Sequence, residues 1–163
     1  MKHPHVRGFT LIEMLIAMVI AAALAAIAIP AYQQYRERLM VNQAKMTIAV
    51  LAADLTRYYS EHNTYPATLA GLGIAIPLDP WGRPYVYVPI NIVPAPIVGK
   101  LYKDKSLHPL NSDFDLYSLG QDGKTSKQIP NTTCNSNGTN NPPSCDDVIR
   151  TGDGSYIGLA SGY

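Results

Sequence analysis

The sequence has little charge, and it lacks any long run of basic residues. Charged residues make up 15% of the 163 residues, and the 13 lysines and arginines are dispersed along the chain, for a net charge of +1. Proteins that bind nucleic acids usually gather lysine and arginine on one surface, because phosphate contacts supply much of their affinity. The chain is therefore not expected to bind nucleic acid.

Histidine and cysteine are also scarce, which argues against most kinds of catalytic site. Of the four histidines, His3 and His5 lie close to the N-terminus. Nothing in the sequence ties His62 or His108 to a serine or cysteine nucleophile with an orienting carboxylate. The phosphate-binding and metalloprotease motifs, GxxxxGKS/T and HExxH, do not occur. We therefore expect a structural or binding protein rather than an enzyme.

What the chain does have is one long apolar stretch, residues 9–32. Every residue from Met14 to Ile29 is apolar, and the only charge in the wider stretch is Glu13. About 20 apolar residues, at a rise of 1.5 Å each, span a hydrocarbon core about 30 Å thick. This predicts a membrane helix. An alternative is a secretory signal, with a cleavage site among the small residues Ala23, Ala25, Ala26 and Ala28.

The charge of Glu13 argues against an ordinary signal or anchor. A carboxylate costs roughly 2.5 to 3.5 kcal/mol at the middle of a bilayer, and somewhat less near the interface. A plain signal or anchor gains nothing from such a charge, so a chain that has it should use it. Pairing with a cation on a neighbouring subunit is one such use.

The residues before the apolar stretch resemble a known processing signal. The segment RGFTLIE, residues 7–13, followed by the apolar helix and Pro30, is similar to the class III signal of type IV pilins and type II secretion pseudopilins. The resemblance implies that prepilin peptidase cuts between Gly8 and Phe9 and N-methylates Phe9. It also implies that Glu13 neutralises a terminal amine during filament assembly. Pro30 is expected to bend the assembly helix or to melt it locally.

These features divide the chain into a leader at residues 1–8, a transmembrane or filament-core helix at 9–35 and a periplasmic globular domain at 36–163. Beyond the apolar stretch, apolar residues recur at steps of three and four, which predicts an amphipathic helix. Residues 63–66, NTYP, end this helix, because Pro66 cannot continue it. The apolar face of the helix consists of Val41, Ala44, Ile48, Leu51, Leu55 and Tyr58.

Two later segments predict strands. Residues 79–87, DPWGRPYVY, begin with a rigid turn and continue with alternating aromatic and aliphatic residues, and residues 113–120 alternate in a similar way. Trp81 is expected to cap a small core rather than to bind a ligand. We expect the two strands to pair antiparallel and to lie against the amphipathic helix. The predicted fold class is α+β: a pilin-like fold in which a long N-terminal helix packs on a small antiparallel sheet with a C-terminal loop.

Both strand segments resemble the major pseudopilin of type II secretion. In that family the second segment, here FDLYSLGQDG, leads into a calcium loop. The resemblance maps the ligands to the backbone carbonyl of Leu119, the side chain of Asp122, and Asp146 or Asp147. Calcium prefers six to eight oxygen ligands, which such a set would begin to supply. The alternative is that these aspartates are solvated loop residues.

The chain departs from that family by a polar insertion that contains Cys134 and Cys145. If the C-terminal part is exported, it lies in an oxidising compartment, and one disulfide is predicted between the two cysteines. Loop closure makes such a bond worth about 2 to 3 kcal/mol. A cysteine metal site is disfavoured, because no histidine and no second cysteine pair lies nearby. By resemblance to type IV pilins, the disulfide can take the place of the calcium ion.

The function implied by the resemblance is that of a structural subunit of the periplasmic pseudopilus of type II secretion. Before assembly, such a subunit would reside in the inner membrane as a single-pass protein. It would then assemble into a helical homopolymer. Its partners would be prepilin peptidase, minor pseudopilins and the inner-membrane assembly platform. Two alternatives stay open. One is a subunit of a surface type IV pilus for adhesion, twitching or DNA uptake, and the other is a membrane-anchored periplasmic binding domain that never polymerises.

Overall fold

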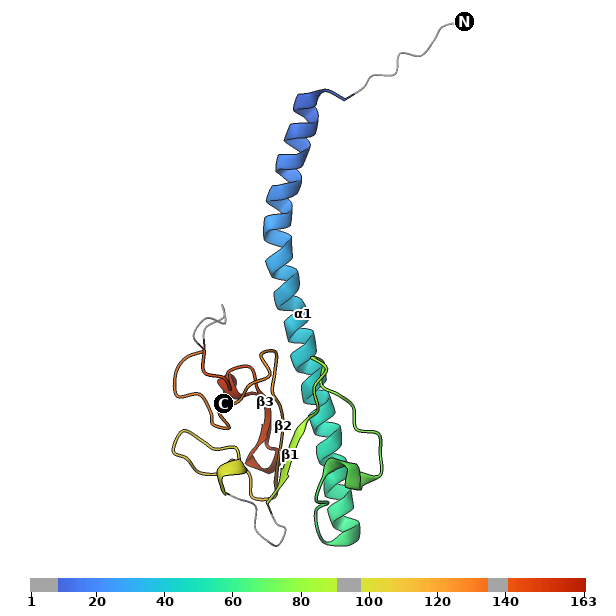
Figure 1. The fold of residues 1–163 in the computed structure, drawn as a ribbon, viewed down its shortest axis with the longest axis vertical. Helices are drawn as coiled ribbons and strands as arrows, with labels where there is room; N and C mark the ends of the chain where they lie inside the picture. Colours follow the sequence, from blue (N-terminus) through green and yellow to red (C-terminus); the bar gives the residue numbers. More distant parts are fainter. Residues whose placement is uncertain (1–8, 91–97, 135–140) are drawn as a thin grey trace, which may run out of the picture. The chain divides into compact units, whose positions relative to one another are not determined.

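The chain forms two compact units, Met1–Arg38 and Leu39–Tyr163, and one helix, α1 (Leu11–His62), contributes residues to both (Figure 1). The computed structural model describes residues 9–90, 98–134 and 141–163. The predicted leader, residues 1–8, therefore lies outside the described residues.

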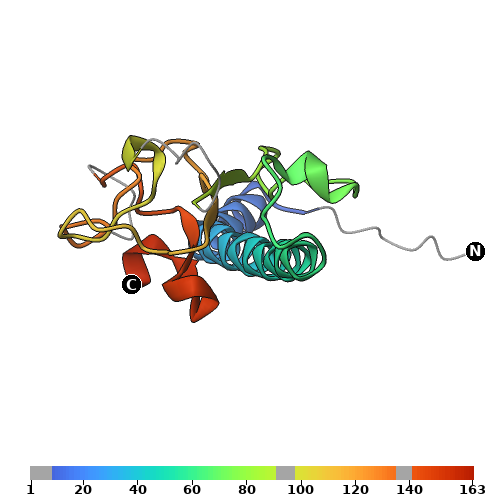
Figure 2. The same cartoon turned by 90° about the horizontal axis from the view of Figure 1, so that it is seen from below.

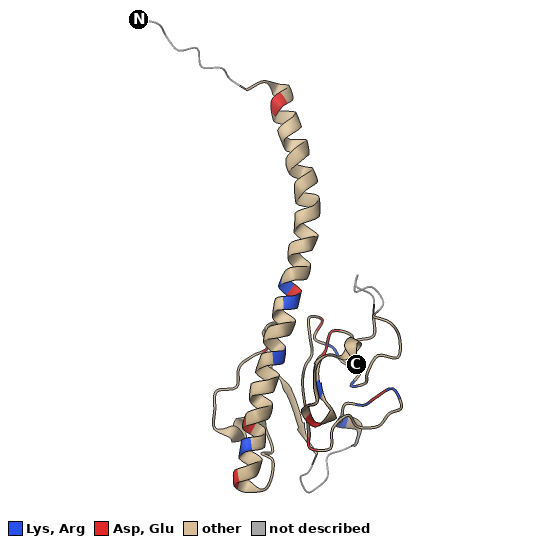
Figure 3. Ribbon diagram, turned by 180° about the vertical axis from the view of Figure 1, so that it is seen from behind, with Lys and Arg blue, Asp and Glu red and all other residues tan. Residues whose placement is uncertain are grey.

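The part of α1 in the first unit is apolar. No lysine, arginine, aspartate or glutamate occurs between Glu13 and Arg36, as Figure 3 shows. Among the described residues, α1 is the one helix long and apolar enough to cross a membrane. Pro30 lies inside α1 rather than at a break in it.

The part of α1 in the second unit is amphipathic, as its sequence pattern predicts. Because a helix has 3.6 residues per turn, steps of three and four place side chains on one face. The buried residues of α1 are five of the six predicted ones, Val41, Ala44, Ile48, Leu51 and Leu55. The sixth, Tyr58, is half-buried and stacks on His62, with ring centroids 4.0 Å apart.

Four short strands form one antiparallel sheet in the order β1-β2-β3-β4. They are β1 (Val86–Pro89), β2 (Phe114–Ser118), β3 (Val148–Thr151) and β4 (Tyr156–Leu159). The predicted antiparallel pair is confirmed as β1 and β2, with Val86 opposite Tyr117. β3 was not predicted from the sequence. Short 3-10 helices occur at Leu69–Leu72, Val98–Lys100, Gly152–Gly154 and Ala160–Gly162.

The sheet is covered on both faces, so every residue of β2 is buried. Alternate residues of a strand point to opposite faces. Phe114 and Leu116 pack with the buried residues of α1 in one core cluster, and Tyr117 packs in a second cluster with Tyr102 and Ile149. Figures 1 and 2 show β1 lying alongside the second half of α1. Trp81 packs against the first cluster, which agrees with the core role expected for it.

Candidate functional site

The predicted processing and assembly motif lies at the start of α1. Phe9 is 84% exposed, whereas Gly8 lies outside the described residues. Glu13 and Thr10 form a reciprocal pair across the first turn. The backbone N–H of Thr10 donates to Glu13 Oε2 at 2.8 Å, and the N–H of Glu13 donates to Thr10 Oγ1 at 3.3 Å. This is a capping box, which satisfies N–H groups that a helix start leaves without partners.

The capping box corrects one premise of the sequence analysis. The charge of Glu13 was expected to give a simple membrane anchor no advantage. Its carboxylate nevertheless accepts hydrogen bonds from Thr10 and so stabilises the start of α1 in its own chain. The spacing Thr-x-x-Glu at Thr10 and Glu13 is the sequence pattern of a capping box and could have predicted this contact. Charge pairing with a neighbouring subunit stays a prediction, and the local role does not exclude it.

The apolar side chains on either side of Glu13 in the first part of α1 are exposed to an unusual degree. Soluble monomers rarely expose one contiguous apolar surface of this kind, because it is a site for lipid or protein contact. Each of these large side chains is at least 51% exposed: Leu11, Ile12, Met14, Leu15, Ile16, Met18, Val19, Ile20, Leu24, Ile27 and Ile29. In the part of the chain that the structure describes, nothing covers this surface.

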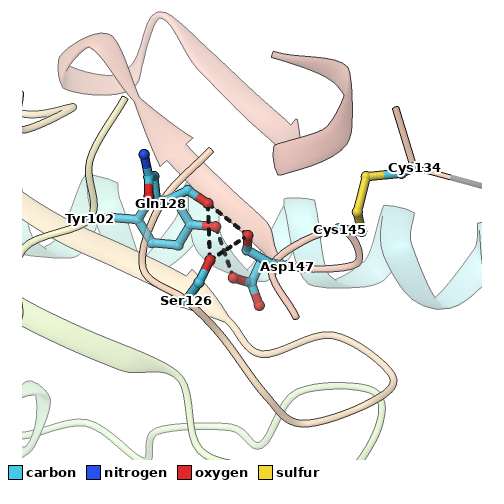
Figure 4. The surroundings of a disulfide bond; sticks show 7 residues. Tyr102, Ser126, Gln128, Cys134, Cys145 and Asp147 are labelled. Carbon is cyan, nitrogen blue, oxygen red and sulfur yellow. Dashed lines mark hydrogen bonds between the residues drawn. A yellow bond between two sulfur atoms is a disulfide. The ribbon is translucent and has the colours of Figure 1, made fainter. Parts of the chain in front are cut away.

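The predicted disulfide between Cys134 and Cys145 is confirmed (Figure 4). The Cα atoms lie 5.9 Å apart, within the range that disulfides require. The bond closes the polar insertion directly before Asp146 and Asp147, two of the predicted calcium ligands. It therefore fixes one end of the segment that leads into β3.

Asp147 is fully buried, and its carboxylate faces hydroxyl groups. Its Oδ2 atom accepts hydrogen bonds from Tyr102 Oη at 2.8 Å and from Thr125 Oγ1 at 2.6 Å. Figure 4 shows Tyr102 and Asp147 side by side. The second oxygen, Oδ1, is buried and has no hydrogen-bond partner among the described residues. Burial raises the pKa of Asp147 to about 7, because removal from water disfavours the ionised form.

Asp122 and Asp146 lie at the turn that follows β2. The Oδ2 atom of Asp146 accepts the backbone N–H of Asp122 at 2.7 Å, and Asp122 Oδ1 accepts the N–H of Lys124 at 2.7 Å. Gly120 has φ +61°, and a Cβ atom there would collide with the backbone of Asp146. The backbone of Gly120 therefore lies so close to Asp146 that only glycine, which has no side chain, fits at position 120. Burial raises the pKa of Asp146 as well.

Among the described residues, the side chains at this turn are not arranged as a metal-binding group. The carboxylates of Asp122, Asp146 and Asp147 each accept hydrogen bonds from N–H or O–H groups. In residues 9–90, 98–134 and 141–163, no group of three or more histidine, cysteine, aspartate or glutamate side chains is placed to hold a metal ion. Leu119, the predicted carbonyl ligand, packs its side chain against the second core cluster. Calcium binding stays a prediction.

Arg83, which was not predicted as a site residue, also contacts this turn. Arg83 donates from Nη1 to the carbonyl oxygen of Gly120 at 2.6 Å and from Nη2 to that of Gln121 at 3.1 Å. Asp79 anchors the start of this segment, since its Oδ1 accepts the N–H of Arg83 and its Oδ2 accepts Ser118 Oγ at 2.6 Å. No signal in the sequence connects residue 83 with a turn almost forty residues later.

Comparisons with known proteins agree with this arrangement. The prokaryotic N-terminal methylation motif matches residues 4–29. The type II secretion system core protein G of Pseudomonas aeruginosa is 33% identical over 138 residues, which cover 72% of this chain and 84% of that protein. Fimbrial proteins and type IV pilins match over shorter stretches, and two of them serve as examples. The fimbrial protein of Neisseria meningitidis is 38% identical over 77 residues, and the fimbrial protein EcpC of Eikenella corrodens is 42% identical over 69 residues.

The two pilin matches each cover 45% of the relative, and they cover 47% and 42% of this chain. No solved structure shows a significant match. A methylation motif at the start of a long apolar helix, joined to a small antiparallel sheet, defines a pilin-like protein. The match to the secretion protein extends beyond the motif over most of both chains. The chain belongs to the family of the type II secretion system core protein G.

Proposed function

We propose that the chain is a structural subunit of the periplasmic pseudopilus of a type II secretion system. The observation that carries this proposal is the 33% identity to a type II secretion core protein over 84% of that protein's length. The exposed apolar surface of α1 supports it, because this surface needs lipid or neighbouring helices around it. The proposed role is structural rather than enzymatic.

Processing and assembly follow from the N-terminal motif. Prepilin peptidase would cut between Gly8 and Phe9 and methylate the new terminal amine. The subunit would first be held in the inner membrane by α1, as a single-pass protein with residues 36–163 in the periplasm. Extraction from the lipid would let many copies pack through α1, and head-to-tail packing that does not close gives an open helical filament. Minor pseudopilins and the inner-membrane assembly platform are the proposed partners.

The experiment that tests the proposal uses a strain of the native host that lacks this gene. We expect exported enzymes to remain in the periplasm while surface filaments are unchanged, and we expect the gene on a plasmid to restore secretion. Intact mass of the protein from wild-type membranes is the second measurement. A chain that begins at a methylated Phe9 supports processing, whereas a full-length unmethylated chain would indicate a membrane-anchored domain that does not polymerise.

A second candidate function is that of a surface type IV pilin. The matches to two fimbrial proteins and the disulfide between Cys134 and Cys145 favour it. In this case the deletion strain would lose surface filaments, or the adhesion, twitching or DNA uptake that depends on them, and secretion would continue. The same strain therefore separates the two functions.

A further inference from the structure

The turn at residues 120–123 already contains a bound cation, the guanidinium group of Arg83. Its two terminal nitrogens contact two consecutive carbonyl oxygens, those of Gly120 at 2.6 Å and Gln121 at 3.1 Å. Arginine is permanently charged, and its planar fork is suited to two acceptors at once. These two contacts bridge 37 and 38 positions of the sequence.

The turn is shaped to receive this side chain. Gly123 has φ +70°, and a Cβ atom at this residue would lie 2.6 Å from Nε and 2.7 Å from Cζ of Arg83. The guanidinium therefore occupies the space that any other residue at position 123 would need for its side chain. The other end of the arginine is fixed too, since its backbone N–H donates to Oδ1 of the buried Asp79 at 2.7 Å.

The position of Arg83 bears on the calcium loop that the family resemblance implies. A calcium ion in such a turn would draw on backbone carbonyls as well as carboxylates. Here the carbonyls of Gly120 and Gln121, which directly follow the predicted ligand Leu119, accept hydrogen bonds from an arginine, and Asp146 accepts the N–H of Asp122. The disulfide closes the other side of the same region, directly before Asp146.

We propose that Arg83 is the resident cation of this turn, and that Arg83 and the Cys134–Cys145 disulfide together hold the C-terminal region closed without calcium. The arginine binds the turn from the side of β1, and the disulfide fixes the segment that enters β3. Neither contact depends on a dissolved ion, so the fold is independent of calcium concentration.

The test is thermal unfolding of the full-length protein in detergent micelles, with excess EDTA or with calcium chloride titrated into the millimolar range. The wild-type Tm should be the same in both. A ligand at 100 times its Kd would stabilise the fold by about 2.7 kcal/mol. In a domain of this size that is a shift of several degrees. A Tm that rises with calcium, or falls in EDTA, would overturn the proposal and establish calcium as the resident cation.

Variants test the arginine itself. Arg83→Gln should lower the Tm in EDTA by about 5 °C, because it removes a charged donor from one partly buried and one exposed contact. Arg83→Lys keeps the charge but not the fork and should lie between wild type and Arg83→Gln. The matched control is Arg57→Gln, whose arginine is exposed and pairs with Asp54 on the surface of α1.

Two results would contradict the role of Arg83. One is an unchanged Tm for Arg83→Gln in EDTA, and the other is a loss no larger than that of Arg57→Gln. If Arg83→Gln does not fold, the comparison of wild type with Arg83→Lys in EDTA and calcium still decides the question. The measurement is repeated with the disulfide reduced, where the loss caused by Arg83→Gln should persist or increase.

Discussion

Asp147 shows how one buried side chain can make stability depend on pH. Its pKa rises from 3.8 to about 7, because burial disfavours the carboxylate. Between these two pH values the folded state therefore holds one more proton than the unfolded state. The free energy of unfolding then falls as pH rises, since stability follows the difference in bound protons. Burial raises the pKa of Asp115 and Asp146 in the same direction.

Replacing Asp147 by asparagine should remove much of this pH dependence. The amide oxygen can still accept from Tyr102 and Thr125, so the contacts at Oδ2 are retained. We expect the wild type to lose on the order of 3 kcal/mol more than Asp147→Asn between about pH 4 and pH 7. Urea unfolding at several pH values measures this difference. Parallel stability curves for the two proteins would refute it, and Glu61→Gln, at an exposed position on α1, is the control.

Arg150 and Asp113 form an ion pair at the edge of the first core cluster. Arg150 Nη2 and Nη1 contact Asp113 Oδ2 at 2.6 Å and Oδ1 at 2.9 Å, and the guanidinium lies 4.1 Å from the centroid of the Phe114 ring. The Arg150 side chain is 4% exposed and that of Asp113 is 19% exposed. Removing one partner of such a pair is costly, because the other charge stays buried.

We therefore expect Arg150→Met to lower the free energy of unfolding by about 3 kcal/mol or more. Arg150→Lys keeps the charge but loses the second contact and the ring stacking, so it should cost about half as much. Chemical denaturation of both variants gives these values. In a double-mutant cycle with Asp113→Asn, a coupling near zero would mean that the pair contributes no stability.

At the scale of elements, Glu13 has two separate roles to test. One is the capping box at the start of α1, and the other is the predicted charge pairing with a neighbouring subunit. The capping box needs only an acceptor three residues after Thr10, which glutamine also provides. Charge pairing with a neighbouring subunit needs the negative charge itself. A single substitution, Glu13→Gln, therefore distinguishes the two roles.

Glu13→Gln should keep the helix start intact and insert into the membrane normally, but it should not assemble into filaments. Glu13→Leu should also insert, and it should fail to assemble. Thr10→Ala removes one half of the capping box while keeping the charge, so assembly should continue with a helix start weakened by about 1 kcal/mol. Filament yield by immunoblot and electron microscopy measures assembly. Normal filaments from Glu13→Gln would mean that the cap, not the charge, is what assembly requires.

The elements that follow a long pattern were predictable from the sequence, and those that depend on distant contacts were not. The five buried residues of α1 repeat over four turns. The residue types in and around β1 and β2 alternate in the way of strands, although every residue of β2 is buried. β3 is four residues long and includes the charged Arg150, which is not typical of a buried strand. Its ion-pair partner Asp113 is distant in the sequence and comes close to it only in the folded sheet.

The same distinction applies to the candidate sites. The disulfide was predictable, because the chain has two cysteines, in a segment that was expected to be exported, and each has only the other as a partner. The directions of the Asp146 and Asp147 carboxylates were not, because they depend on donors such as Tyr102 Oη that lie far away in the sequence. The contact of Arg83 with the turn after β2 is of the same kind.

At the scale of the whole molecule, the two units use apolar surface in different ways. All buried residues of α1 lie between Val41 and Leu55, and both core clusters consist of residues of the second unit. The apolar residues of α1 before Pro30 are exposed in the single chain. Folding of the globular part therefore depends on residues that come after the membrane segment.

A fragment of residues 36–163 should thus fold alone as a soluble monomer, with a single cooperative urea transition. It keeps both core clusters, the four-stranded sheet and the disulfide. It loses the apolar part of α1, so it should neither bind detergent micelles nor polymerise, whereas the full chain should do both. Size-exclusion chromatography with light scattering and far-UV circular dichroism check this. A fragment that is unfolded, or that forms filaments without the apolar segment, would show that this segment contributes to the fold or that assembly uses another surface.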